Sequence, residues 1–157
     1  MSARPRRVVL VCTGNTCRSP LAEALLRAAL EARGVEEVEV ISAGTGAWEG
    51  APATESAYLV GLEKGLDLSG HRARLLTADL ATPSDLVLTM ARHHRARVLE
   101  LSPAAQVHLF AEYAATSGAA PEVSDPYGAD LDTYRRTRDQ LAGLAEAVAD
   151  RVSAGGS

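Results

Sequence analysis

Cys12 and Arg18 are separated by five residues near the start of the chain. A cysteine thiolate is a strong nucleophile, and the planar guanidinium of an arginine can bind two oxygens of a tetrahedral anion. The residues between them are Thr13-Gly14-Asn15-Thr16-Cys17. Because fifteen of the sixteen basic residues are Arg, this spacing arises easily by chance. Its meaning therefore depends on the elements that hold the two side chains.

The segment around these residues has the pattern of a strand, a turn and a helix. Residues 8–11 are apolar and mostly β-branched, which is typical of a strand buried on both faces. Ser19 and Pro20 are typical of the N-cap and first residue of a helix, and Gly34 of its end. A second strand is predicted over residues 38–41, so the unit is βαβ with parallel strands.

The turn between this strand and helix can curl into a bowl whose backbone N–H groups point inward. Such a bowl binds an anion with several charged oxygens, because the helix N-terminus adds a positive field. Gly14 and Asn15 tolerate the positive φ that the bowl requires. The same field favours the thiolate form of Cys12. The alternative is a tight turn in which Cys12 is simply a small buried residue.

The rest of the chain continues to alternate between helices and strands. We expect helices over residues 52–64 and 91–100, strands over 85–90 and 106–109, and a loop over 114–126. Asp130 can cap a last helix. One face of that helix would carry Tyr134, Leu141, Leu144, Val148 and Val152.

These elements predict one α/β domain over residues 1–157, with frayed tails at residues 1–6 and 153–157. The domain would have three layers (α/β/α), with a central four-stranded parallel sheet as the middle layer. The chain has 157 residues, of which 46% are hydrophobic and 23% charged. This composition is typical of a globular protein and excludes a disordered chain or a coiled coil.

The charge balance and the cysteine count exclude several classes of partner. A net charge of −4 argues against nucleic-acid binding, and no apolar run approaches the roughly 20 residues of a membrane span. The apolar run at residues 8–11 is also too short for a secretory signal. Two cysteines and four histidines provide neither a disulfide scaffold nor a zinc site. We expect a cytoplasmic monomer without metal, cofactor, nucleic-acid or membrane partner.

Residues 12–23, Cys-Thr-Gly-Asn-Thr-Cys-Arg-Ser-Pro-Leu-Ala-Glu, resemble the phosphate-binding loop of the low-molecular-weight protein tyrosine phosphatase family. The resemblance covers nearly the whole chain in the family's order and spacing. Its other parts are Ser42-Ala43-Gly44-Thr45, Trp48, His71-Arg72-Ala73-Arg74, residues 85–90 and Asp125-Pro126-Tyr127-Gly128. It implies the Rossmann-like fold of that family and a cysteine-dependent phosphatase that acts on phosphorylated proteins.

The resemblance also implies roles for individual residues. Cys12 would attack phosphorus and form a phosphocysteine, and Arg18 would hold the phosphoryl group. Asp125 would protonate the leaving group and then activate water, although by itself it reads only as the start of an Asp-Pro turn. Ser19 would give its hydroxyl to the Cys12 thiolate.

Further residues of the resemblance would bind the substrate or support the bowl. Thr13, Gly14, Asn15, Thr16 and Cys17 would surround the phosphoryl group. Asn15, together with Ser42 and His71, would hold the bowl in shape. Trp48 and Tyr127 would form the walls around the substrate side chain; the alternative for both is ordinary packing.

Two departures from the tyrosine-specific pattern concern the substrate. Tyrosine-specific members usually carry Ile at the position of Thr16 and two aromatic residues where this chain has Tyr127 and Gly128. Both features resemble the protein arginine phosphatase branch. A hydroxyl on the pocket wall can hydrogen-bond the guanidinium of phosphoarginine, and a site built for a polar group rejects analogues that lack it. We expect a protein-arginine-phosphatase; the alternative is a low-molecular-weight protein-tyrosine-phosphatase, with Thr16 a neutral substitute for Ile.

Other interpretations of the same loop differ in class. An arsenate reductase would need cysteines downstream of Cys17, and the chain has none. A phosphopeptide-binding module would have lost Cys12 or Asp125, and both are present. A thiol redox sensor remains an alternative. We also expect that a reversible Cys12–Cys17 disulfide protects the nucleophile from over-oxidation, unless Cys17 is only a buried thiol.

Overall fold

The central sheet has four parallel strands in the order β2-β1-β3-β4. A computed structural model describes residues 5–114 and 122–155. The strands are β1 (Arg7–Cys12), β2 (Glu39–Gly44), β3 (Asp85–Thr89) and β4 (Gln106–Leu109). In β1, Val9 lies opposite Ile41 on one side and Val87 on the other. The predicted parallel sheet is therefore confirmed, and β1 lies in its interior.

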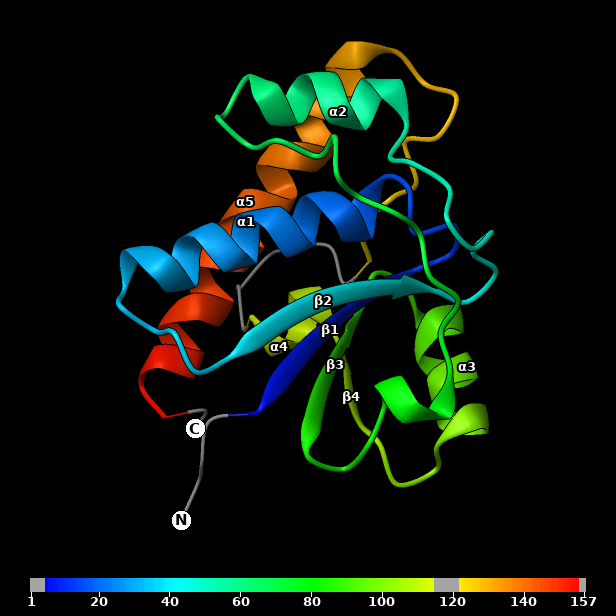
Figure 1. The fold of residues 1–157 in the computed structure, drawn as a ribbon, viewed down its shortest axis with the longest axis vertical. Helices are drawn as coiled ribbons and strands as arrows, with labels where there is room; N and C mark the ends of the chain where they lie inside the picture. Colours follow the sequence, from blue (N-terminus) through cyan, green and yellow to red (C-terminus); the bar gives the residue numbers. More distant parts are fainter. Residues whose placement is uncertain (1–4, 115–121, 156–157) are drawn as a thin grey trace.

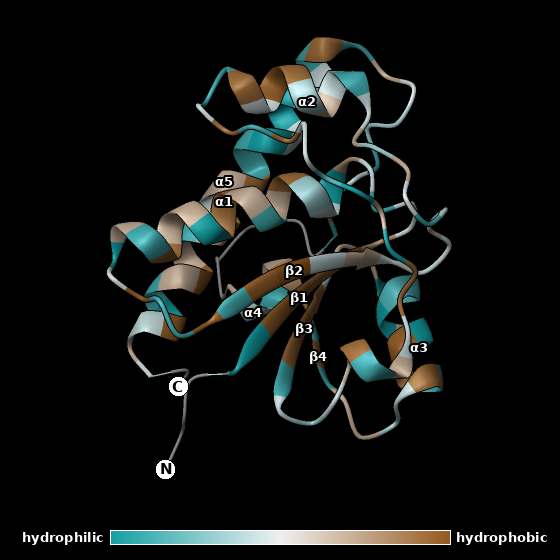
Figure 2. Cartoon of the chain, viewed as in Figure 1, coloured by the Kyte–Doolittle hydropathy of each residue, from teal (hydrophilic) through white to brown (hydrophobic). Residues whose placement is uncertain are grey.

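Successive residues of the strands are buried against two helical layers, because strand side chains alternate between the faces of a sheet. On one face, Val8 and Leu10 pack with α1 (Arg18–Ala32) and α5 (Leu131–Ser153). On the other face, Val9 and Val11 pack with Val98 of α3 (Arg92–Leu101). Figure 1 shows α1 and α5 together on one side of the sheet and α3 on the other. The strands are mainly hydrophobic and the helices mixed, as Figure 2 shows.

Three short helices complete the fold. The helix predicted over residues 52–64 is α2 (Glu55–Leu62), which packs on α5. It begins later than predicted because Thr54 is its N-cap and accepts a hydrogen bond from the Ala57 amide. The 3₁₀ helix η1 (Ala78–Leu80) and helix α4 (Phe110–Tyr113) were not predicted. Such short elements carry no periodicity that a sequence pattern could reveal.

The predicted start of α5 is confirmed, whereas the predicted start of α1 is wrong. Asp130 caps α5 by accepting a hydrogen bond from the Thr133 amide, and the five residues predicted for the apolar face are buried. Helix α1 instead begins at Arg18 with Cys17 as N-cap, so the prediction of Ser19 as N-cap was wrong. The Ser19 hydroxyl bonds to Cys12 and Asn15 and is not available as a cap.

The expected tails are shorter where the structure describes them. The carbonyl of Arg6 accepts a hydrogen bond from the Glu39 amide, and Ser153 is the last residue of α5. Residues 1–4 and 156–157 lie outside the described residues, as does the part of the predicted loop at residues 115–121. No helix within residues 5–114 and 122–155 combines the length and apolarity that crossing a bilayer requires.

An ion pair joins the amino ends of β1 and β3. The Asp85 side chain is fully buried, and its Oδ2 lies 2.7 Å from the Arg7 guanidinium. Thr82 donates its amide and its hydroxyl to the same oxygen, at 3.1 and 2.8 Å. Burial opposes ionisation of this carboxyl, but the bonds from Arg7 and Thr82 outweigh it and lower the pKa of Asp85. The buried carboxylate is thus compensated by an opposite charge.

Candidate active site

The loop at residues 12–18 connects the end of β1 to the start of α1. Asn15 has φ of +57°, whereas Gly14 does not have a positive φ, so the expectation for Gly14 was wrong. The loop lies against Gly44 at the end of β2. A Cβ atom there would come within 2.3 Å of the Thr13 carbonyl oxygen and 2.9 Å of the Asn15 nitrogen. Only glycine fits this position, which the sequence analysis left without a role.

The Cys12 sulfur lies at the floor of this loop. Its side chain is buried, and Sγ lies 2.9 Å from the Ser19 hydroxyl oxygen and accepts the Asn15 amide hydrogen at 3.3 Å. The Asn15 side-chain amide donates to the same hydroxyl oxygen at 2.8 Å. Because the Ser19 oxygen accepts from Asn15, its own hydrogen is available to the sulfur. Both neighbours can therefore donate a hydrogen bond to the sulfur.

Asn15 connects the loop to the residues behind it. Its Nδ2 also donates to the Ser42 hydroxyl at 2.9 Å, and its Oδ1 accepts from the Arg74 amide at 2.9 Å. The His71 ring nitrogen Nε2 lies 2.6 Å from the Asn15 carbonyl oxygen. Asn15 is fully buried and is not among the residues that line the cavity above the loop. The structure therefore places Asn15, Ser42 and His71 together behind the loop.

A cavity of about 230 Å³ opens above the Cys12 sulfur. Its lining residues come from the loop and from one distant segment. They are Cys12, Thr13, Gly14, Thr16, Cys17, Arg18, Asp125 and Tyr127. All eight are residues that the sequence analysis placed at the site. Trp48 is not among them, and it is 84% exposed.

Arg18 joins the loop to the distant segment. Its buried guanidinium donates to the Val123 carbonyl at 2.9 Å and lies 3.7 Å from the Asp125 carboxylate. The Asp125 side chain is half exposed, and its Oδ1 accepts the Tyr127 amide hydrogen at 3.0 Å. A carboxyl group and a guanidinium therefore face the same cavity as the sulfur. Val123, which the sequence analysis did not single out, is the contact that orients Arg18.

Cys17 is held by two elements that lie far away in the sequence. Its sulfur lies 3.4 Å from the Thr54 hydroxyl and 3.3 Å from the Tyr134 hydroxyl. Burial and the contact with Cys17 raise the pKa of Tyr134 to about 12, so the phenol keeps its proton. Both cysteines are free thiols. The Cys12–Cys17 disulfide stays a prediction, and no sequence signal pointed to Thr54 or to the role of Tyr134.

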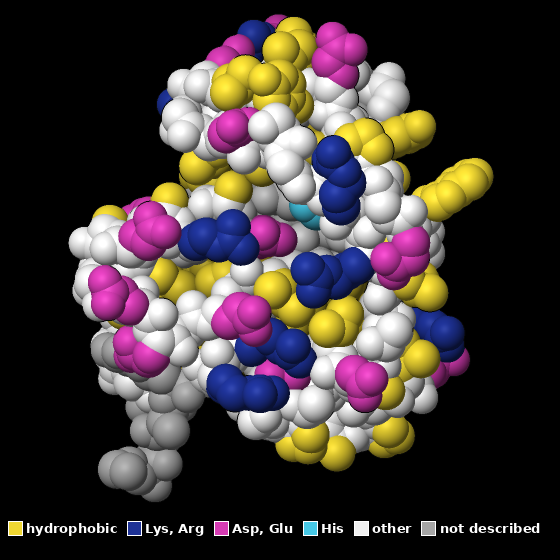
Figure 3. Space-filling model, viewed as in Figure 1, with side chains coloured by type: hydrophobic (Ala, Val, Ile, Leu, Met, Phe, Trp, Pro, Cys, Tyr) yellow, Lys and Arg dark blue, Asp and Glu magenta, His cyan; other side chains and the backbone are white. Residues whose placement is uncertain are grey.

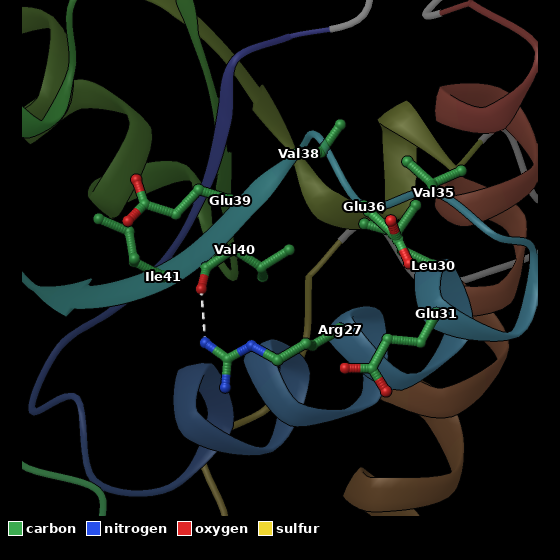
Figure 4. A pocket seen from close by; sticks show the side chains of 9 residues that line it. All are labelled: Arg27, Leu30, Glu31, Val35, Glu36, Val38, Glu39, Val40 and Ile41. Atoms are coloured by element: carbon green, nitrogen blue, oxygen red, sulfur yellow. Dashed lines mark hydrogen bonds between the residues drawn. The ribbon is translucent and has the colours of Figure 1, made fainter.

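A larger cavity, of about 460 Å³, lies between the second half of α1 and β2. Its lining is apolar and charged: Arg27, Leu30, Glu31, Val35, Glu36, Val38, Glu39, Val40 and Ile41. Arg27 reaches across it to the Val40 carbonyl at 2.7 Å, as Figure 4 shows. No cysteine or other nucleophilic side chain is among the described residues that line this cavity. The candidate site is therefore identified by the chemistry of its lining residues and not by its volume.

Basic and acidic side chains intermingle on the described part of the face in Figure 3. No group of three or more potential metal ligands occurs within residues 5–114 and 122–155.

Comparison with known proteins agrees with this geometry. The family model "Low molecular weight phosphotyrosine protein phosphatase" matches residues 7–155. A protein-arginine-phosphatase of Geobacillus stearothermophilus is 37% identical over 94% of this chain and 97% of its own length. A low molecular weight protein-tyrosine-phosphatase of Streptomyces coelicolor is 38% identical over 93% of this chain and 95% of its own.

A solved structure extends the comparison to three dimensions. It is a mutant of the YwlE arginine phosphatase with a phosphorylated active-site serine, 36% identical to this chain. It matches with a TM-score of 0.85, and the match covers 92% of this chain and 94% of that structure's chain. The chain belongs to the low molecular weight phosphotyrosine protein phosphatase family.

Proposed function

We propose that this chain is a protein phosphatase that uses Cys12 as its nucleophile and acts on phosphoarginine in proteins. The observation that carries the proposal is the single cavity lined by Cys12, Arg18 and Asp125. A nucleophile, an anion-binding cation and a proton donor are the three groups that phosphoryl transfer through a covalent intermediate requires. The phosphorylated serine in the related arginine phosphatase mutant supports a phosphorylated nucleophile at this place.

The first step transfers the phosphoryl group to sulfur. The Cys12 thiolate attacks phosphorus, the S–P bond forms, and the bond from phosphorus to the substrate nitrogen breaks. Asp125 gives its proton to the departing nitrogen, which leaves as a neutral guanidine. Arg18 and the inward backbone amides hold the phosphoryl oxygens, whose charge is spread over three atoms in the transition state.

The second step releases phosphate. Asp125, now a carboxylate, takes a proton from a water molecule that attacks phosphorus. The P–S bond breaks, inorganic phosphate leaves, and the Cys12 thiolate is restored. The Ser19 hydroxyl, 2.9 Å from the sulfur, stabilises the thiolate as it departs. The protons balance over the two steps, because Asp125 is protonated at the start of the cycle and again at its end.

The substrate class rests on Thr16. The two curated relatives above carry different substrate names at 37% and 38% identity, so overall similarity does not choose between phosphoarginine and phosphotyrosine. Thr16 lines the cavity, and its hydroxyl can bond to a guanidinium nitrogen beside phosphorus. Tyr127 is 72% exposed and is followed by Gly128, which leaves one side of the cavity without an aromatic wall. Phosphotyrosine is the second candidate.

Paired peptides of one sequence, carrying phosphoarginine or phosphotyrosine, test the substrate class. We expect the wild type to prefer phosphoarginine, and Thr16→Val and Thr16→Ile to shift the ratio of kcat/KM values about tenfold toward phosphotyrosine. Thr16→Val is the matched variant, because it removes the hydroxyl and keeps the β-branched shape.

The outcomes separate the parts of the proposal. Equal preference in the wild type and both variants rejects the role of Thr16 and leaves the phosphatase intact. Binding of inorganic phosphate without turnover of either peptide rejects the phosphatase and favours a phosphopeptide-binding module.

A further inference from the structure

His94, in the first turn of α3, is a fully buried titratable side chain that the proposed reaction does not use. Its Nδ1 accepts the Ala91 amide hydrogen at 3.1 Å. Its Nε2 lies 2.8 Å from the hydroxyl oxygen of Thr13, the residue that follows Cys12. Because the Ala91 hydrogen occupies Nδ1, the ring hydrogen of the neutral imidazole is on Nε2 and is donated to Thr13.

The surroundings of the ring keep it neutral. Burial is the largest effect, and the neighbouring His93 and Arg18 also lower the pKa of His94, to about 4. Asp125 and Glu122 act in the opposite direction and are outweighed. A protonated ring would carry a hydrogen on Nδ1 that meets the Ala91 amide hydrogen. The neutral form is therefore the one that fits both partners.

The turn that carries His94 contacts both parts of the site. The Met90 amide donates to the carbonyl of Val11, the residue before Cys12, at 3.0 Å. The Met90 carbonyl accepts the Val123 amide at 2.8 Å, and the Arg92 amide donates to the Glu122 carboxylate at 2.8 Å. Residues 90–94 thus lie between the Cys12 loop and the segment that leads to Asp125.

We propose that His94 is a positioning residue that holds Thr13 in place through its Nε2 hydrogen and thereby fixes the first half of the anion-binding loop. This inference rests on the proposed function. Thr13 is exposed and its hydroxyl would otherwise rotate in solvent. The Thr13 carbonyl already accepts the Gly46 amide hydrogen at 3.0 Å, so His94 restrains the side chain. An apolar side chain could fill the volume of the His94 ring, but it would leave the buried Ala91 amide and the Thr13 hydroxyl without their imidazole partner. A buried imidazole satisfies both groups with one ring.

Two substitutions of His94 separate its two hydrogen bonds. In His94→Asn, the Asn Oδ1 reaches the position of the ring Nδ1 and keeps the Ala91 bond, but no donor reaches Thr13. In His94→Gln, the amide nitrogen reaches the position of Nε2 and donates to Thr13. Thr13→Val removes the partner and keeps the shape. The wild type, His94→Asn, Thr13→Val and the double variant His94→Asn/Thr13→Val form a cycle that measures the coupling between the two residues.

The readouts are orthovanadate binding, kcat and KM on one phosphopeptide, and thermal unfolding. We expect His94→Asn and Thr13→Val each to weaken orthovanadate binding and kcat/KM about tenfold, and His94→Gln to stay within threefold of the wild type. The double variant should be no worse than either single variant, because each substitution removes the same bond.

Three results would overturn the assignment: equal loss in His94→Asn and His94→Gln, multiplied losses in the double variant, or a lower melting temperature with unchanged orthovanadate binding. The last result would make His94 a packing residue only. If the wild type turns over no phosphopeptide but orthovanadate binding follows the expected pattern, the proposed function fails and the assignment of His94 stands.

Discussion

Buried polar groups lie at both ends of the sheet, and they differ in how their charge is compensated. At the amino end, the Asp85 carboxylate is paired with the Arg7 guanidinium at 2.7 Å. At the carboxyl end, the Cys12 sulfur has only neutral donors in hydrogen-bond contact, the Ser19 hydroxyl and the Asn15 amide, and it faces a cavity. A carboxylate already neutralised by a cation adds to stability. A sulfur that faces open space and neutral donors can react.

The direction of the strands explains why the buried ion pair lies at the amino end of the sheet and the Cys12 loop at its carboxyl end. In a parallel sheet, all carboxyl ends lie at one edge, where the following helices present their N-termini. The field at that edge favours anions, and Arg18 of α1 adds a full positive charge to it. At the opposite edge, Arg7 and Asp85 are register partners on neighbouring strands, so they meet directly. The field at the carboxyl edge therefore favours an anion, whereas the charges at the amino edge are already paired with each other.

The largest effect on activity is expected for Cys12→Ser. This change keeps the shape of the side chain at the carboxyl end of the sheet and replaces the sulfur by a hydroxyl oxygen. We expect turnover to fall by at least about 10³-fold, because a serine hydroxyl is far less nucleophilic than a thiolate. Binding of inorganic phosphate, measured by calorimetry, should persist. Appreciable steady-state turnover by the serine variant would rule out the covalent route.

A smaller effect is expected for Asp125→Asn, which removes the carboxyl group that we propose as the proton donor at the same end. The Asn side chain can still accept the Tyr127 amide hydrogen, so the turn is kept, whereas Asp125→Ala loses the turn as well. We expect kcat to fall about 10³-fold for a substrate with a poor leaving group and about tenfold or less for an aryl phosphate with a good one. Equal losses on both substrates would show that Asp125 is not the acid.

The smallest effect on activity is expected for Asp85→Asn, which breaks the ion pair at the amino end. Removing one partner leaves the Arg7 charge uncompensated, so we expect a loss of about 3 kcal/mol in the free energy of unfolding. The kcat/KM of the folded variant should stay within about twofold of the wild type. A large loss of activity without a loss of stability would contradict the division between the two ends.

The same variant should change the dependence of stability on pH. Because the folded pKa of Asp85 is lowered, its contribution is present above the unfolded value of about 3.9 and is lost as the pH falls through the folded value. The wild type should therefore lose more stability than Asp85→Asn when denaturant unfolding is compared at pH 5 and at about pH 3. Parallel losses in the two proteins would mean that folding does not lower the pKa of Asp85.

Local patterns in the sequence were sufficient for the strands, for α1 and α5, and for the loop at residues 12–18. The apolar run that becomes β1 and the Asp130 cap of α5 are properties of a few neighbouring residues, which is why they could be predicted. Asp125 was identified only through the family resemblance, because an Asp-Pro pair by itself is a common turn. The start of α1 was misjudged because Ser19 serves the site and not the helix end.

The contacts that complete the site depend on the tertiary structure. Gly44 lies against the loop because β2 pairs with β1, and His94 reaches Thr13 because β3 pairs with β1 on the other side. Tyr134 was predicted as a buried helix residue, but its contact with Cys17 requires α5 to pack beside α1. The sequence determined which groups can do chemistry and which segments form elements, since both depend on neighbouring residues. The order of the strands and the packing of the helices decided which distant groups meet.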